Sequence, residues 1–153
     1  MKIIGAIDIG SNAIRMICAR LTPDRRIELV ESVRTPLRLG LDVFKFGYLQ
    51  EVTINNLVES IEIFQRTLSQ NKCEQIRAYG TSALREADNA DELISKIERI
   101  ISKDTIISSS TSSFMPSELQ NVCTQPERVI VGHPMNPPHL IWTAHLLSPF
   151  LLA

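Results

Sequence analysis

The sequence has little excess charge of either sign and few cysteines. Its 16 basic and 17 acidic residues nearly cancel, so no long-range field favours nucleic acid, an anionic membrane or a polyanion as partner. The three cysteines, Cys18, Cys73 and Cys123, are odd in number and lack the CxxC spacing of a metal site. A disulfide framework is therefore not expected, a reduced cytoplasmic setting is favoured, and any anion site must be local.

The sequence also lacks a secretion signal and a long apolar run. Asp8 interrupts the opening apolar stretch, and no small-residue cleavage site follows it. The stretch from Leu140 to Ala153 is broken by His145 and Pro149 and is shorter than the roughly 20 residues of a spanning helix. Because 44% of the residues are apolar and 22% are charged, we expect a soluble domain with one modest core.

The apolar pattern predicts a β-meander followed by alternating helices and strands. The expected elements are strands over Lys2 to Ile9, Ala13 to Leu21 and Arg26 to Val33, an amphipathic helix over Glu51 to Gln70, a strand over Gln75 to Gly80, a helical turn over Ala83 to Ala87 and a helix capped by Asp91. Past Lys103 serines and prolines accumulate, and only Arg128 to Val131 is typical of another strand.

The turn after the first strand carries residue types that bind phosphate. Gly10 lets the backbone approach a ligand closely, and exposed N–H groups of such a turn can cradle phosphate oxygens. Asp8 is the residue type that holds Mg²⁺ directly or through water. From these residues alone, an ordinary hairpin in which Ser11 and Asn12 bond their own backbone is equally compatible.

Three motifs, in order, carry a resemblance to a known family. GAIDIGSNAIRMICAR, RTPLRLGLDVFKFGYL and AYGTSALREADN resemble the exopolyphosphatase/guanosine pentaphosphate phosphohydrolase (Ppx/GppA phosphatase) family over residues 3 to about 102. The resemblance implies an α/β fold, namely the first domain of the actin-like ATPase (ribonuclease H-like) superfamily, a mixed sheet with flanking helices, here truncated. It also implies Mg²⁺-dependent hydrolysis of the terminal phosphoanhydride of polyphosphate or guanosine pentaphosphate.

The same resemblance assigns residues to roles. It implies a metal carboxylate at Asp8 and phosphate-binding residues at Gly10, Ser11, Asn12, Arg38 and Arg85. Arginine suits the last two positions because its fork of donors matches phosphate oxygens. Taken singly, each of these arginines is equally typical of a solvated surface. Arg15 follows in the next strand, and Thr81 and Ser82 either donate to the same anion or cap the following turn.

The resemblance ends near residue 102. In the family, the catalytic base is a glutamate close to a glutamate-rich ISGEEE-like segment. In this sequence Lys103 to Ser108 stands there instead, without an acidic cluster. The catalytic base is therefore unknown, and we expect the chain to be an inactive fragment.

Residues from about Thr105 to Ile141 resemble a second family. Their SSTSS turn and GHPMNPP segment are similar to those of the 3-hydroxyacyl-CoA dehydrogenases, especially the carnitine dehydrogenase branch. This implies that Ser109 or a neighbouring serine binds the substrate oxygen, that His133 is the general base and that Asn136 steadies the segment. However, Trp142 to His145 replaces the strand that would supply an orienting carboxylate, and this sequence contains no GxGxxG turn for NAD.

Three interpretations stay open from the sequence. The first is a phosphate-binding Ppx/GppA-type fragment over residues 1–102. The second is a fragment of an NAD-dependent 3-hydroxyacyl-CoA or carnitine dehydrogenase over residues 103–141, with residues 142–153 as an unassigned tail of a fused or frameshifted product. The third is a non-catalytic interaction protein, for example a homodimer formed through a sheet edge or the apolar face of the 51–70 helix.

Overall fold

The computed structural model describes residues 1–24, 26–80, 82–109, 120–121, 123–134 and 144–147. The fold is α/β, as predicted. Its elements are β1 (Lys2–Ile9), β2 (Ala13–Leu21), β3 (Ile27–Pro36), α1 (Leu39–Phe46), α2 (Glu51–Gln70), β4 (Gln75–Gly80), α3 (Ser82–Glu86), α4 (Ala90–Ile100), β5 (Ile106–Ser109), the 3-10 turn η1 (Pro126–Arg128), β6 (Val129–Pro134) and β7 (Ala144–Leu147). None of the described helices is long and apolar enough to cross a membrane.

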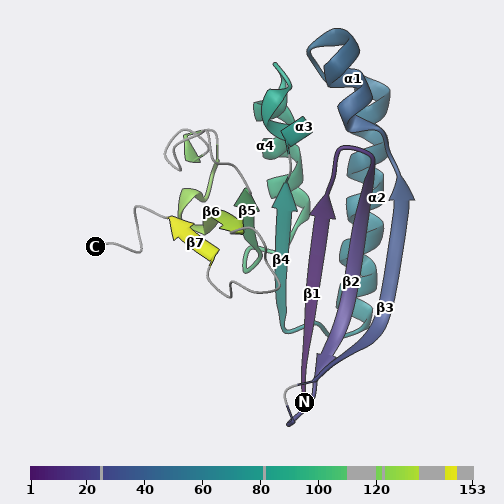
Figure 1. Cartoon of the computed structure of the whole chain (residues 1–153), viewed down its shortest axis with the longest axis vertical. Helices are drawn as coiled ribbons and strands as arrows, with labels where there is room; N and C mark the ends of the chain where they lie inside the picture. Colours follow the sequence, from purple (N-terminus) through teal and green to yellow (C-terminus); the bar gives the residue numbers. More distant parts are fainter. Residues whose placement is uncertain (25, 81, 110–119, 122, 135–143, 148–153) are drawn as a thin grey trace.

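The described strands form one mixed sheet in the order β3-β2-β1-β4-β5-β6-β7 (Figure 1). The first three strands pair antiparallel, which confirms the predicted meander. Strands β1, β4, β5 and β6 pair parallel, and β7 closes the row antiparallel to β6. Because β1 and β4 run in parallel, with Ile9 opposite Gly80, the turn after β1 and the segment after β4 leave the sheet at the same edge.

Helix α2 forms the core with one face of the central strands. Its apolar stripe includes Phe64 and Leu68, which are fully buried and belong to one hydrophobic cluster with Ile7 of β1 and Met16 of β2. Burial of each such side chain contributes roughly 1.5–3 kcal/mol. Helix α4 packs beside α2 in the same cluster, so the helical spacing predicted for Glu51 to Gln70 is confirmed.

Helix α1 was not predicted, and two boundaries differ from the expectation. β3 reaches Pro36, which pairs with Ala13; a proline is tolerated there because β3 is an edge strand. Asp91 does not cap α4. The helix begins at Ala90 with Asn89 in the N-cap position, and the Asn89 side chain is hydrogen-bonded to Leu49 instead.

Past Lys103 the chain contributes two strands that were not predicted, β5 and β7. β5 has only four residues, IISS, which is too short for an alternating pattern to be recognised. Its place depends on parallel pairing with β4 on one side and β6 on the other. The strand expected over Arg128 to Val131 is present as β6, which begins at Val129 and extends to Pro134.

Two cysteines that are far apart in the sequence meet in the fold. The Cys18 and Cys73 sulfur atoms lie 3.2 Å apart as free thiols. Cys18 is buried on β2, and Cys73 lies in the connection between α2 and β4. Burial, together with the Cys18 thiol, raises the pKa of Cys73 to about 12. Since the thiolate is the reactive form, Cys73 is a poor nucleophile at neutral pH.

A buried ion pair joins the two parts of the chain that resemble different families. Arg128 Nη2 lies 3.5 Å from Glu98 Oε1, and the two side chains are only 7% and 2% exposed. The Glu98 carboxylate also accepts from the N–H groups of Thr124 and Gln125, at 2.8 and 2.9 Å. Arg128 donates to the backbone carbonyls of Glu98 and Ser102. Residues on both sides of residue 103 therefore satisfy one another's polar groups.

The surroundings of Glu98 also determine its pKa. Burial acts to raise this pKa, but the hydrogen bonds from Thr124 and Gln125 and the neighbouring Arg128 outweigh burial and leave it below its usual 4.5. A carboxylate whose pKa is lowered by folding stabilises the fold at pH values above the pKa that it has in the unfolded chain. This contribution to stability is lost as the pH falls through the pKa that Glu98 has in the folded chain.

Replacement of Glu98 by glutamine is expected to destabilise the chain by about 3 kcal/mol at pH 7, because it leaves Arg128 buried without its counter-charge. The variant should also lose less stability than the parent when the pH falls below 4.5. Urea unfolding at several pH values measures both effects. The control is Glu92→Gln, which breaks the exposed Glu92–Lys96 pair and should cost less than about 0.5 kcal/mol. Equal effects of the two variants would contradict a connecting role for Glu98.

Candidate phosphate-binding site

The turn between β1 and β2 and the start of α1 meet at one edge of the sheet. Gly10 N–H donates to the Ala13 carbonyl at 3.1 Å, which closes the turn, and Gly40 N–H donates to the Ser11 carbonyl at 2.8 Å. A Cβ on Gly10 would lie 2.8 Å from the Ala13 carbonyl oxygen, and a Cβ on Gly40 would lie 3.0 Å from Ser11 Cβ. Both glycines therefore permit a close approach that a larger residue would prevent.

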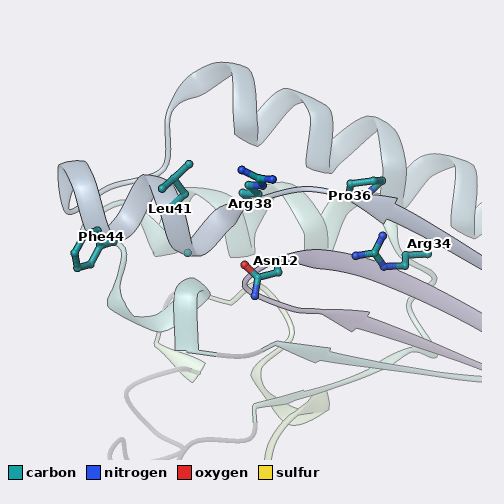
Figure 2. Close-up of a pocket in the computed structure, with 7 residues that line it drawn as sticks. Asn12, Arg34, Pro36, Arg38, Leu41 and Phe44 are labelled. Carbon is teal, nitrogen blue, oxygen red and sulfur yellow. The ribbon is translucent and has the colours of Figure 1, made fainter.

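An open cleft of about 850 Å³ lies beside this contact. Asn12 lines it from the turn, and further lining residues come from the end of β3 and from α1. The full lining is Asn12, Arg34, Pro36, Arg38, Gly40, Leu41 and Phe44. Figure 2 shows the Arg38 side chain above Asn12, and the Arg34 side chain further along β3, directed toward Asn12. The cleft thus combines two guanidinium groups with an amide, a set of donors suited to an anion.

A row of charged residues crosses the sheet next to the turn. Asp8 of β1 is directly opposite Arg15 of β2, and Arg15 is directly opposite Arg34 of β3. On the other side of Asp8 stands Tyr79 of β4. Directly opposed residues share one face of a sheet, and all four side chains are exposed, on the face that α2 and α4 leave uncovered.

Two sets of hydrogen bonds hold α1 where it forms the cleft wall. Asn89 accepts from Leu49 N–H and donates to the Leu49 carbonyl, both at 2.9 Å. Next to it, Asp88 N–H donates to the Gly47 carbonyl. Gly47 ends α1 in the left-handed conformation, with φ 78°, which an L side chain rarely adopts. The α3–α4 connection thereby fixes the far end of α1.

The second set of hydrogen bonds is centred on Asp42. This buried carboxylate of α1 accepts from Gln50 N–H at 3.1 Å and from Gln50 Nε2 at 3.2 Å. Burial acts to raise the pKa of Asp42, but hydrogen bonds from Thr53 and Gln50 outweigh it, so that the pKa is lowered. Asp42 is thus a structural carboxylate that connects α1 to the start of α2.

The structure brings together most, but not all, of the predicted site residues. Asn12 and Arg38 line the cleft. Ser11 contacts Gly40 at the start of α1, Gly10 closes the same turn, and Asp8 lies just before it on β1. Arg85 lies within α3, but its side chain, like that of Ser82, is outside the described part of the chain, and so is all of Thr81. Arg34 was missed because the predicted third strand ended at Val33, and the pairing of Arg34 with Arg15 depends on a register that shifts between Cys18 and Ala19.

The residues of the dehydrogenase resemblance lie elsewhere in the sheet. His133 is in β6, opposite His145 of β7, and β4 and β5 separate β6 from β1. Ser109 is the last residue of β5. The side chains of these residues, and all of Asn136, are outside the described part of the chain. The His133 segment and the phosphate turn therefore do not form one site.

Asp8 is the carboxylate available for a metal at the turn. No cluster of three or more His, Cys, Asp or Glu side chains able to hold a metal occurs among the described residues. Mg²⁺ is commonly held by one or two carboxylates together with the phosphates of the ligand and with water. Asp8 fits this mode, in which the metal is bound together with a phosphate ligand.

Comparison with solved structures identifies the class of fold. A crystal structure of the Ppx/GppA family member from Aquifex aeolicus aligns with a TM-score of 0.64 and 25% identity, over 71% of this chain and 35% of that chain. Exopolyphosphatase 1 of Mycobacterium bovis is 23% identical over 96 residues, which cover 63% of this chain and 28% of that protein. Over the aligned 71% of the chain, the structure thus has the α/β, actin-like ATPase fold of the Ppx/GppA phosphatases.

A second family also matches the chain. L-carnitine dehydrogenase of Bacillus cereus is 49% identical over 49 residues, which are 32% of this chain and 15% of that protein. The family described as 3-hydroxyacyl-CoA dehydrogenase, NAD binding domain, matches residues 45–147, more than half of the chain, and the chain belongs to that family over this range. The matched part of this chain spans less than a third of the length of L-carnitine dehydrogenase or of exopolyphosphatase 1. The family match over residues 45–147 includes α2, β4 and α4, which share their core with β1 and β2.

Replacement of Gly40 by alanine is expected to weaken phosphate binding about tenfold without a large loss of stability. Alanine is favoured over glycine in a helix by about 1 kcal/mol, and this gain offsets the cost of moving α1 away from Ser11. Gly47→Ala is the matched control at the other end of α1. It should destabilise the fold by about 1–2 kcal/mol because of its positive φ, while the folded chain keeps its affinity. Thermal unfolding and phosphate titration distinguish the two variants. Unchanged phosphate affinity in Gly40→Ala would contradict a role of the Gly40–Ser11 contact in phosphate binding.

Proposed function

We propose that residues 1–102 are a phosphate-binding domain that holds the terminal phosphates of polyphosphate or guanosine pentaphosphate, and that this chain does not hydrolyse them. The observation that carries the proposal is the meeting of the Gly10–Asn12 turn with Arg38 in one open cleft. The similarity of this part of the chain to exopolyphosphatases supports the same ligand class. Residues 103–141 are the dehydrogenase-like segment, and residues 142–153 are the tail.

In this proposal each group at the cleft has a separate task. The Gly10–Asn12 turn, which the Gly10 N–H closes by donating to the Ala13 carbonyl, approaches the phosphate oxygens, while Arg38 neutralises charge from the α1 side. Arg85 of α3 supplies a second guanidinium. A Mg²⁺ ion held by Asp8 would neutralise further negative charge and orient the phosphate chain. This set of groups binds and positions a phosphoanhydride.

The proposed lack of hydrolysis rests on the segment after α4. Attack of water on a phosphoanhydride requires a group that orients or deprotonates the water. At the place of the family's glutamate-rich segment this chain has β5, whose sequence IISS contains no carboxylate. The binding groups are therefore present without an assigned base. Cys18, Cys73 and Cys123 are not joined in disulfides, which supports the reduced cytoplasmic setting that we propose.

A dehydrogenase activity is the second candidate, favoured by the family match over residues 45–147 and by the 49% identity to carnitine dehydrogenase. In that case His133 would take the hydroxyl proton while hydride passes to NAD. Reduction of NAD⁺ that depends on carnitine and is lost on replacement of His133 or Ser109 would support this activity. An interaction protein, acting as a homodimer, is the third candidate, and sedimentation at several concentrations would detect it.

The phosphate proposal predicts binding of tripolyphosphate in the presence of Mg²⁺ and no release of inorganic phosphate. Asp8→Asn should reduce the effect of Mg²⁺ on this binding, and Arg38→Gln should weaken binding about tenfold or more, as a charge-assisted hydrogen bond is worth roughly 1.5–3 kcal/mol. Calorimetric titration and a phosphate-release assay measure the two quantities, with His133→Ala as control.

The possible results separate the parts of the proposal. Phosphate release that depends on Asp8 would show that a base is recruited from elsewhere, and would contradict the lack of hydrolysis. If the folded chain does not bind tripolyphosphate at all, the phosphate-binding role is wrong. If His133→Ala weakens phosphate binding as much as Arg38→Gln does, the site lies in the wrong part of the sheet.

A further inference from the structure

Arg34 is a cleft residue that the proposed phosphate turn leaves without a task. It lies on β3 and lines the same cleft as Asn12 and Arg38, and Figure 2 shows its side chain directed toward the side on which Asn12 lies. Arg34 takes part in none of the salt bridges found among the described residues. Arg34 is exposed on an edge strand, so its side chain is not part of the hydrophobic core.

The pairing of the strands makes Arg34 electrostatically unfavourable in the absence of a ligand. Arg34 stands directly opposite Arg15, and like charges that face each other across two antiparallel strands destabilise the pairing of those strands. Asp8, on the other side of Arg15, supplies one negative charge to this row. Together with Arg38, which lines the cleft from the start of α1, these residues bring three guanidinium groups and one carboxylate to this side of the sheet, and a bound anion would reduce the repulsion between the cations.

The positions of these charges also bear on the length of the anion. β3 is two strands away from β1, which at the usual spacing of 4.7–4.9 Å places the Arg34 backbone about 10 Å from that of Asp8. A phosphoryl group held at the turn beside Asp8 therefore leaves Arg34 available for another part of the same ligand. The cleft extends in this direction, because Pro36 and Arg34 line it along β3.

We infer that Arg34 binds a second phosphoryl group of the ligand, so that the cleft selects chains of two or more phosphates over orthophosphate. This inference rests on the proposed function, because the first phosphoryl group is the one held by the turn and Arg38. Arg34 is thus a specificity residue. The planar fork of arginine matches the oxygens of a phosphoryl group, whereas lysine would supply the charge without the two parallel hydrogen bonds.

A different role for Arg34 leads to a different expectation. Charged side chains on edge strands discourage pairing with other chains. If this were its only role, replacing Arg34 would promote association of the protein and leave its affinity for phosphates unchanged. Size-exclusion chromatography of the same variants therefore accompanies the binding measurements.

The test compares orthophosphate, pyrophosphate and tripolyphosphate as ligands of the full chain, by calorimetry at fixed Mg²⁺. Arg34→Gln should raise the dissociation constant for tripolyphosphate tenfold or more and that for orthophosphate less than twofold, with pyrophosphate also weakened. Arg34→Lys should give an intermediate loss. Arg38→Gln should weaken all three ligands, and Arg66→Gln, at an exposed position of α2, should weaken none.

Each result has a definite meaning. Selective loss of the longer ligands in Arg34→Gln supports the inference. Unchanged affinity in Arg34→Gln, or an equal loss for orthophosphate and tripolyphosphate, overturns it while the proposed function stands, provided that the parent binds and Arg38→Gln does not. If the folded parent binds none of the three phosphates, the proposed function fails and the role of Arg34 fails with it.

Discussion

The hydrogen bond from Gly40 N–H to the Ser11 carbonyl holds together parts of the chain that are distant in sequence, and the cleft depends on it. It places the start of α1 against the β1–β2 turn, so that Arg38 and Asn12 border the same space. Without it, the turn would be an ordinary hairpin and Arg38 a solvated surface residue. The remaining contacts of α1, made through Asp42, Gly47 and Asn89, keep the helix in the position that this bond requires.

A second constraint acts across the region where the two family resemblances meet. The sheet continues from β4 into β5 and β6, and the buried Glu98–Arg128 pair satisfies backbone groups on both sides. The dehydrogenase-like segment thus completes a sheet whose first strands belong to the Ppx/GppA-like part. A buried charge left without its partner is costly, so the segments on either side of residue 103 depend on each other for the burial of Glu98 and Arg128.

Much of the fold could be predicted from the sequence because it depends on local patterns. The meander and α2 follow from the spacing of apolar residues, and both are present. Helix α1 could not be predicted, because its segment mixes glycine and the highly exposed Phe44 and is held by Asn89 from elsewhere in the chain. β5 likewise depends on neighbours that local patterns do not reveal. At the site, motif resemblance pointed to Gly10, Ser11, Asn12 and Arg38, whereas Arg34 follows from strand pairing.

The central claim is that the turn and the start of α1 form one anion site, and backbone amide NMR tests it directly. In the free chain the Gly40 amide should be protected from hydrogen exchange, because it donates at 2.8 Å to the Ser11 carbonyl. On titration with tripolyphosphate and Mg²⁺, the amide resonances of Gly10, Ser11, Asn12 and Gly40 should shift along one binding curve. Rapid exchange at Gly40, or shifts confined to β6 and His133, would contradict the account.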